Sequence, residues 1–190
     1  MQLGLIADIH GNLLALDAVL AAIARRGIAR VVCLGDLALN GPRPRECVAR
    51  VMALDCPTLL GNNDAWLLED AKPLGVAGQW MQELEAWNSR QLTPVQRDWV
   101  RALPATLTID LGHARTLCCC HGSPFERALL PGRFKTFPWA EYAVISASAN
   151  QIAVELCRLP LAEAAIAADT RASGMPHAEC WIAERKRYGS

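Results

Sequence analysis

Metal-ligand side chains recur just after short apolar runs of this sequence. The residues concerned are Asp8, His10, Asp36, Asn62 and His121. Each stands next to or close to a glycine, which lets the backbone turn sharply and come near an ion or a phosphate. Carboxylate oxygen and neutral imidazole nitrogen together suit zinc, manganese or iron. Because ligands bind at the carboxyl ends of the strands in open α/β sheets, we expect these side chains to converge at that edge.

A shared carboxylate would let these residues hold two cations. Two metal ions about 3.5–4 Å apart need one bridging carboxylate, with nitrogen and oxygen ligands on each side. Asp36 follows the middle one of three predicted strands and is the expected bridge, with Asp8 and His10 binding one ion. The other ion would be bound by His121 and by Asn62, whose neutral amide keeps the ion pair electron-poor and lets a bound water ionise near neutral pH.

Alternating strands and helices must position the first of these residues. Residues 2–7 are an apolar run typical of a buried strand, and apolar residues at helical spacing predict a helix over 13–26. A strand over 30–34, a helix around 47–52 and a short strand over 57–60 follow. This order predicts a parallel sheet with right-handed crossovers.

The middle of the chain changes from helical to period-two patterning. Residues 65–102 are predicted to be helical, with a capping box and a first-position proline in the segment 93–96. Alternating apolar residues predict antiparallel strands over 106–111 and 116–120. His113 lies in the turn between them and is assigned no ligand role.

The last third of the chain is predicted to close the fold. Residues 125–140 lack periodicity and are interpreted as a loop. A hairpin with strands over 142–145 and 152–156 follows. Closing helices are predicted over 161–172 and 178–187.

Composition places the chain among ordinary globular proteins, and its length predicts one domain over residues 1–190. Formal net charge is zero, so nucleic-acid binding is not indicated. The first residues have no basic segment and the apolar runs are short, so we expect neither a signal peptide nor a membrane span. The eight cysteines include no Cys-x-x-Cys pair. This disfavours a zinc ribbon, and we interpret them as free thiols in a reducing cytoplasm.

Collected, these motifs resemble those of the calcineurin-like metallophosphoesterase superfamily. The matches are Asp8-Ile9-His10, Gly35-Asp36, Gly61-Asn62-Asn63-Asp64 and His121. The resemblance is closest to the small bacterial and archaeal phosphodiesterase branch. It implies the α/β class, with a metallophosphoesterase-like β-sandwich of mixed sheets flanked by helices. It also implies two divalent ions (Mn, Fe, Zn or Ni), a small phosphate-ester substrate and in-line attack on phosphorus by a metal-bound hydroxide.

The sequence departs from the family pattern at two motifs. Asn63 occupies a position where the family has histidine, and with Asp64 it is assigned to the catalytic set; substrates then shift toward diesters or esters with good leaving groups. No Gly-His-x-His follows His121, so we infer an internal deletion that shortens the sandwich and removes one histidine from each metal. Arg133, in the junction loop, and Asn12, beside the first motif, are candidate substrate contacts. A helix cap is the alternative role for Asn12.

Two functions stay open from the sequence. One is a divalent-metal-dependent phosphoesterase, more narrowly a phosphodiesterase. The other is a degenerate member of the family that acts as a binding or regulatory module. A dinucleotide-binding domain is disfavoured because the first turn lacks Gly-x-Gly-x-x-Gly. The inferred deletion would expose a sheet edge, which a homodimer would cover.

Overall fold

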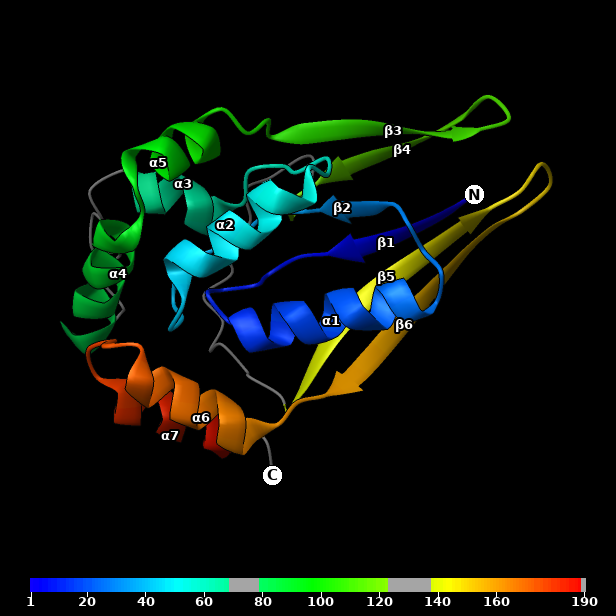
Figure 1. Cartoon of the computed structure of the whole chain (residues 1–190). Coiled ribbons are helices and arrows are strands. Elements are labelled where there is room, and N and C mark those ends of the chain that lie inside the picture. Colours follow the sequence, from blue (N-terminus) through cyan, green and yellow to red (C-terminus); the bar gives the residue numbers. More distant parts are fainter. Residues whose placement is uncertain (69–78, 123–137, 189–190) are drawn as a thin grey trace.

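The computed structural model describes residues 1–68, 79–122 and 138–188, which form two facing β-sheets with helices around them (Figure 1). Strand and helix alternate at the start of the chain, helices run in succession in the middle, and strands return before two closing helices. No helix in these ranges combines the length and the apolar composition that crossing a membrane requires.

The larger sheet has four strands in the order β2-β1-β5-β6. β1 (Gln2–Ile6) and β2 (Val31–Cys33) are parallel, as predicted, because α1 (Leu13–Arg25) returns the chain between them. β5 (Trp139–Ala147) pairs antiparallel with β1 and continues into β6 (Ile152–Pro160) as the predicted hairpin. The sheet is therefore mixed, and β6 lies at one edge of it.

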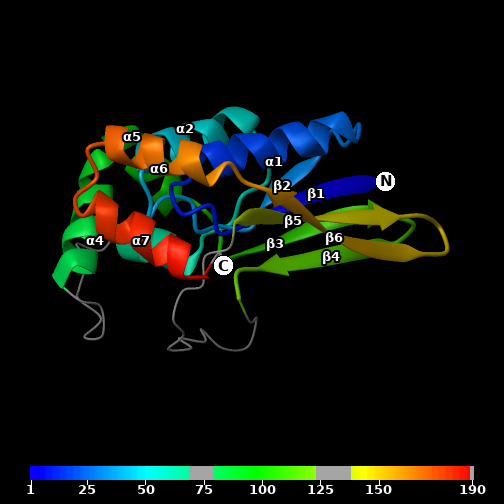
Figure 2. The same ribbon diagram turned by 90° about the horizontal axis from the view of Figure 1, so that it is seen from below.

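The smaller sheet is the hairpin of β3 (Thr106–Gly112) and β4 (Arg115–Cys120), which lies beneath the larger sheet in Figure 2. Inward-facing side chains from both sheets form a common core. Its buried members are Leu3, Val32, Leu59, Ile109, Leu111, Cys119, Ile145 and Ala147. The two sheets thus form the predicted sandwich.

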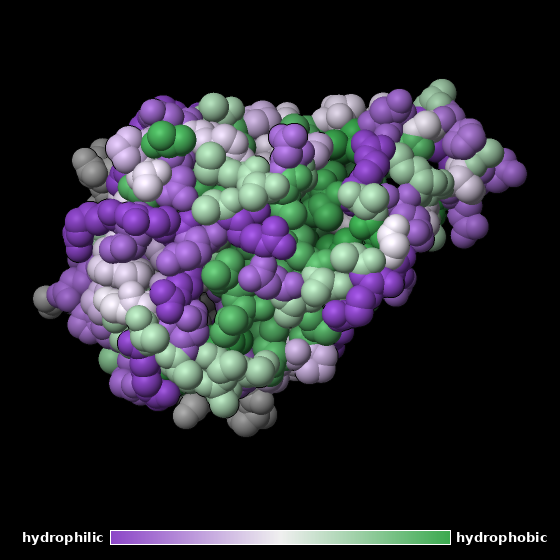
Figure 3. Space-filling model, in the orientation of Figure 1, coloured by the Kyte–Doolittle hydropathy of each residue, from purple (hydrophilic) through white to green (hydrophobic). Residues whose placement is uncertain are grey.

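The opposite face of the larger sheet is covered by α1 and α2 (Pro44–Leu54), so the molecule is layered as helices, sheet and sheet (Figure 2). Leu16, Ile23 and Val48 of these helices share a second core with Ile6 of β1. α1 is apolar along most of its length, and hydrophobic residues gather in a band across the middle of Figure 3, where α1 lies in Figure 1.

The remaining helices lie at the end of the molecule toward which β1 and β2 run (Figure 1). They are α3 (Asn62–Leu68), α4 (Gln79–Gln91), α5 (Pro94–Arg101), α6 (Glu163–Ala172) and α7 (Ala178–Tyr188). The predicted capping box at the start of α5 is present. These helices lie near the carboxyl ends of β1 and β2, where the first ligand-type residues were expected.

The predicted strand over 57–60 is wrong in extent. Thr58 forms only an isolated parallel bridge with Cys33. Pro57 has no N–H to add to a ladder, and the N–H of Leu60 donates to Pro104 at 2.8 Å, outside the sheet. The segment therefore approaches β2 at one point and then turns into α3.

The predicted loop over 125–140 is too long at its end. β5 begins at Trp139, which pairs with Pro160 of β6. The rest of the predicted loop, from 125 to 137, lies outside the described residues. The junction of the inferred deletion falls in the same segment, and so does Arg133.

Candidate metal centre

Two loops, one after β1 and one after β2, run side by side and carry the first ligand candidates. The Asp8 N–H donates to the Gly35 carbonyl at 3.1 Å, and the His10 N–H donates to the Asp36 carbonyl at 3.0 Å. Asp8, His10 and Asp36 have left-handed backbone angles, with φ of 52°, 46° and 59°. Such angles are costly for residues other than glycine and persist where surrounding contacts impose them. The paired loops therefore hold these three residues in fixed turns.

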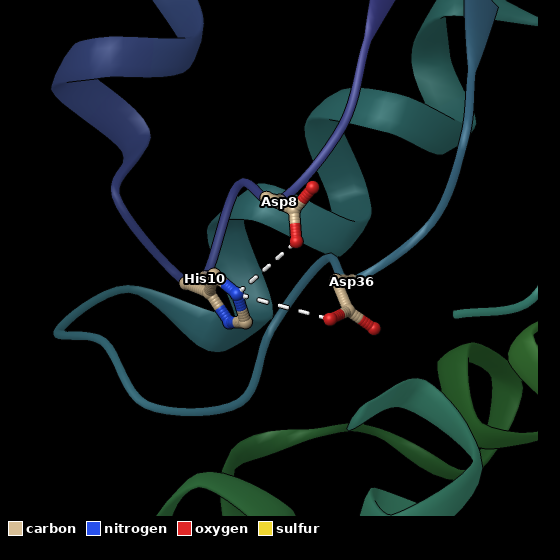
Figure 4. Close-up of side chains that lie close together, drawn as sticks. All are labelled: Asp8, His10 and Asp36. Atoms are coloured by element: carbon tan, nitrogen blue, oxygen red, sulfur yellow. Dashed lines mark ion pairs between the residues drawn. The ribbon is translucent and has the colours of Figure 1, made fainter. Parts of the chain in front are cut away.

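The His10 ring lies between two carboxylates (Figure 4). Its Nε2 is 3.6 Å from Oδ1 of Asp8 and 3.8 Å from Oδ2 of Asp36. One ligand atom from each residue lies within 4.8 Å of the others. The Asp8 side chain is exposed, whereas that of Asp36 is buried. The cluster thus lies where the protein core meets solvent, so a cation could enter from one side.

His121 reaches the same place from the second sheet. It follows directly after β4, and its Nε2 lies 3.3 Å from Oδ2 of Asp36. This is the same oxygen that faces His10. Asp36 therefore stands between two imidazoles from different sheets, as the carboxylate predicted to bridge two ions must.

Backbone carbonyls orient both imidazoles. Nδ1 of His10 lies 3.0 Å from the Leu39 carbonyl, and Nδ1 of His121 lies 2.7 Å from the Leu34 carbonyl. Because a carbonyl can only accept, we assign a proton to Nδ1 in each ring. Nε2 then faces the carboxylates, an arrangement typical of metal-binding histidines. The donor set of this site therefore fits a divalent cation.

The carboxylates of the site favour protonated imidazoles. The hydrogen bond to Asp36 raises the pKa of His121 to about 9, although burial opposes this. Burial alone would lower the pKa of His10, but Asp8 and Asp36 together raise it. Burial alone would raise the pKa of Asp36, but the two histidines and Asn63 hold it below its usual value. A cation must displace the histidine protons, because imidazole binds metal in its neutral form.

Asp64, assigned to the catalytic set from the sequence, is buried against the loop after β2. Its carboxylate accepts the backbone N–H groups of Asp36 at 2.7 Å, Leu37 at 2.8 Å and Gly61 at 3.0 Å. Burial raises the pKa of Asp64, while these donors stabilise its charged form. The structure thus shows Asp64 supporting the loop backbone, and a catalytic role for it stays a prediction.

The start of α3 binds both oxygens of Asp36. Asn63 is buried and donates its backbone N–H to Oδ1 at 2.9 Å and its side-chain N–H to Oδ2 at 2.5 Å. This approach requires Gly61, where a Cβ atom would lie 2.1 Å from Oδ1 of Asp36. Asn62 is half-buried one residue earlier, and its assignment as a ligand stays a prediction. Asn63 orients the carboxylate, so its contact with a leaving group also stays a prediction.

Of the two predicted substrate contacts, Asn12 and Arg133, the structure describes only Asn12. Oδ1 of Asn12 accepts the N–H of Ala15 at 3.1 Å and caps α1, which is the alternative role considered for it. Arg133 lies outside the described residues. His113 lies in the turn between β3 and β4 with φ of 55°, in agreement with its interpretation as a turn residue.

Asn40 is a neighbour of the site that the sequence patterns did not single out. It lies in the loop between β2 and α2, has φ of 73°, and places its Nδ2 3.4 Å from Oδ1 of Asn63. Asparagine followed by glycine, here Gly41, is typical of a turn with left-handed backbone angles. That dipeptide is the signal that could have drawn attention to it.

Comparison with known proteins adds the family and the fold. A family model described as the calcineurin-like phosphoesterase superfamily domain matches residues 1–145. Over 67 residues the chain is 46% identical to an uncharacterised protein of Methanocaldococcus jannaschii, a match that covers 35% of this chain and only 28% of that protein. Because the match covers so little of that relative, nothing about its activity is inferred for this chain.

Two solved structures share the fold over nearly their whole length. A metallophosphoesterase from Sphaerobacter thermophilus is 20% identical, with 98% of each chain covered and a TM-score of 0.68. A hypothetical protein from Pyrococcus horikoshii OT3 is 16% identical, with 97% of each chain covered and a TM-score of 0.74. At these identities the likeness establishes the fold alone.

The family match and the geometry concern the same part of the molecule. Residues 1–145 include β1, β2 and β4 and the loops that place Asp8, His10, Asp36 and His121 around one point. The resemblance inferred from the motifs is confirmed, and the chain belongs to the calcineurin-like phosphoesterase superfamily.

Proposed function

We propose that this protein is a divalent-metal-dependent phosphodiesterase. Membership of the phosphoesterase superfamily supports hydrolysis of phosphate esters in general. The observation that carries the proposal is Oδ2 of Asp36, which lies 3.8 Å from Nε2 of His10 and 3.3 Å from Nε2 of His121. All eight cysteines are free thiols, which supports the reducing cytoplasm as the place of action.

The proposed ligands could hold two divalent ions, with Mn, Fe, Zn or Ni as candidates. They are Asp8, His10, Asp36, Asn62 and His121. Bound ions would supply positive charge to a phosphoryl group and an activated water. The chain itself orients the ligands, because the carbonyls of Leu34 and Leu39 hold the two imidazoles and Asn63 holds Asp36.

The side chain of Asn63 favours diesters with good leaving groups. An amide has no useful acidity, so this residue cannot protonate a departing alkoxide as a histidine could. Asn63 also donates two hydrogen bonds to Asp36, which hold it against the carboxylate. Aryl phosphodiesters, which release a stabilised phenolate, should therefore react faster than alkyl esters.

Hydrolysis of bis(4-nitrophenyl) phosphate and 4-nitrophenyl phosphate with added Mn²⁺ tests the proposal. We expect faster cleavage of the diester, and for Asp36→Asn a loss of kcat/KM beyond the roughly 10–100-fold typical of changes next to metal ligands. His113→Asn is the matched control, because it removes a histidine from a turn and should leave activity unchanged. Equal activity of wild type and Asp36→Asn would refute the proposal.

The absent Gly-His-x-His motif favours a second candidate, a binding or regulatory module. Fewer ligands predict weaker metal binding and slow or no turnover. Metal analysis of purified protein separates the two functions. Two ions per chain with diester cleavage support the enzyme, whereas phosphate binding without turnover at saturating Mn²⁺ supports the module.

A further inference from the structure

We propose that Asn40 is a positioning residue of the metal centre, which acts through Asn63 on Asp36 and is itself held by α4 and α7. The inference rests on the proposed function only in taking Asp36 as the bridging ligand. Asn40 lies outside the motifs that carry the resemblance to the family. Hydrogen bonds of defined direction join the side chains of Asn40, Asn63 and Asp36.

The charge of Asp36 sets the direction of these hydrogen bonds. Its carboxylate can only accept, so the side chain of Asn63 must turn its Nδ2–H toward Oδ2, at 2.5 Å. Oδ1 of Asn63 then faces away from Asp36 and needs a donor. Nδ2 of Asn40 lies 3.4 Å from it and is that donor. Each amide therefore has one orientation, dictated by the carboxylate.

The other end of the Asn40 amide supports this assignment. Oδ1 of Asn40 is buried and has no hydrogen-bond partner in the part of the chain that the structure describes. Turning over the Asn40 amide alone would place its oxygen against Oδ1 of Asn63. Turning over both amides would place the oxygen of Asn63 against the carboxylate of Asp36. The unpaired oxygen of Asn40 is costly. The Asn40 amide nevertheless keeps this orientation, because either alternative places one oxygen acceptor against another.

Two helices hold the backbone of Asn40. Its N–H donates to Oδ1 of Asn88 in α4 at 2.9 Å, and its carbonyl accepts the indole N–H of Trp181 in α7 at 2.7 Å. Asn88 also donates to the carbonyl of Gly41 at 2.8 Å. The loop is thus fixed at Asn40 and at Gly41, and the side chain of Asn40 has little freedom to leave Asn63.

The contact from Trp181 extends the site beyond the family match. α7 lies outside residues 1–145, which are the residues that the family model covers. The C-terminal helix nevertheless reaches Asp36 through three successive residues: Trp181, Asn40 and Asn63. Changes in α7 are therefore expected to alter the metal centre without contacting it.

Asn40→Gly tests the inference with little risk to the fold. Glycine adopts the left-handed angle of residue 40 freely and keeps both backbone hydrogen bonds, so only the amide is lost. Asp55→Gly is the matched control, because Asp55 also has a left-handed angle, with φ of 48°, but caps α2 away from the site. Trp181→Phe is a second variant, which removes the indole N–H and its hydrogen bond to Asn40 but keeps a smaller aromatic ring at the same position.

Two measurements decide the outcome. Calorimetry should show Mn²⁺ binding weakened about tenfold or more in Asn40→Gly, with a smaller loss in Trp181→Phe and none in Asp55→Gly. In metal-free ¹⁵N-labelled protein, the side-chain amide protons of Asn63 should exchange faster with water in Asn40→Gly. A melting temperature equal to or above that of wild type would show that the fold is intact.

The two readouts separate this inference from the proposed function. Unchanged Mn²⁺ affinity together with unchanged exchange at Asn63 would overturn the role of Asn40. Wild-type protein that binds no Mn²⁺ would instead refute the proposed function. In that case the exchange measurement alone decides whether Asn40 positions Asn63 and Asp36.

Discussion

In the proposed metal site His121 binds a cation through Nε2, so its proton must leave first, which predicts a steep dependence of metal affinity on pH. Its hydrogen bond to Asp36 raises the pKa of His121 to about 9, so the ring is almost fully protonated at neutral pH. Mn²⁺ competes with that proton for Nε2. Raising the pH should therefore strengthen Mn²⁺ binding until the ring is neutral.

One displaced proton gives a defined slope. Below the pKa, each pH unit changes the apparent affinity about tenfold, which corresponds to roughly 1.36 kcal/mol. Between pH 6.5 and 8.5, Mn²⁺ binding should accordingly tighten about 100-fold from His121 alone. The pKa of His10 is raised as well, so this residue adds to the slope at the lower end of the range.

The stability of metal-free protein should change in the opposite direction. The pKa of His121 in the fold, about 9, lies above its ordinary value of 6.5. The protonated ring therefore stabilises the fold fully below pH 6.5, and this stabilisation is lost as the pH rises through 9. Melting temperature without metal should fall over the range in which Mn²⁺ binding tightens.

Competition with a fluorescent chelator at several pH values between 6.5 and 8.5 measures the slope. His121→Gln removes the titrating ring, so log Kd should fall less steeply with pH, by about one log unit per pH unit. His113→Asn should keep the wild-type slope. Wild-type affinity that does not change with pH, or an unchanged slope in His121→Gln, would show that Mn²⁺ does not displace a proton from His121.

The other predictions concern residues around the centre and the exposed sheet edge. Asp64→Asn replaces a carboxylate that accepts three backbone N–H groups and should lower the free energy of unfolding by about 3 kcal/mol or more. Urea denaturation measures this, and a loss within error would contradict the supporting role. Asn12→Ala should cost about 1 kcal/mol as a lost helix cap; an increased KM for the aryl diester would instead support substrate contact. Leu156 on the edge strand β6 is 84% exposed, and we expect β6 to pair two chains in a homodimer. Light scattering should find dimeric wild type and monomeric Leu156→Lys, and a monomeric wild type would exclude this interface.

The meeting of Asp8, His10 and Asp36 could be predicted from the order of the elements. Parallel strands joined by a helix end at the same edge of a sheet, so residues that follow β1 and β2 must be neighbours. His121 comes from a hairpin in the other sheet. Its position depends on how the sheets face each other, which period-two patterning does not specify, and the family motifs supplied that step.

The contacts of Asn63 and Asp64 could not be predicted from residue type and spacing. Asp64 accepts N–H groups that the loop after β2 leaves unpaired, and those groups become known only when the turns after Gly35 are defined. The side chain of Asn63 is held by Asn40, which no periodic pattern links to the site. Sequence patterns identify candidates, while the unpaired backbone groups decide which of them face a ligand.

The left-handed angles of Asp8, His10 and Asp36 have an evolutionary consequence. Glycine would adopt these angles without steric penalty, whereas each other residue costs about 1–2 kcal/mol. At Asp8, whose side chain is exposed, selection for heat resistance alone would favour glycine and would erase a candidate ligand, whereas Asp36 also accepts two N–H groups of Asn63. The presence of Asp8 therefore indicates a trade-off, in which this edge of the sheet keeps its chemistry at the expense of thermal stability.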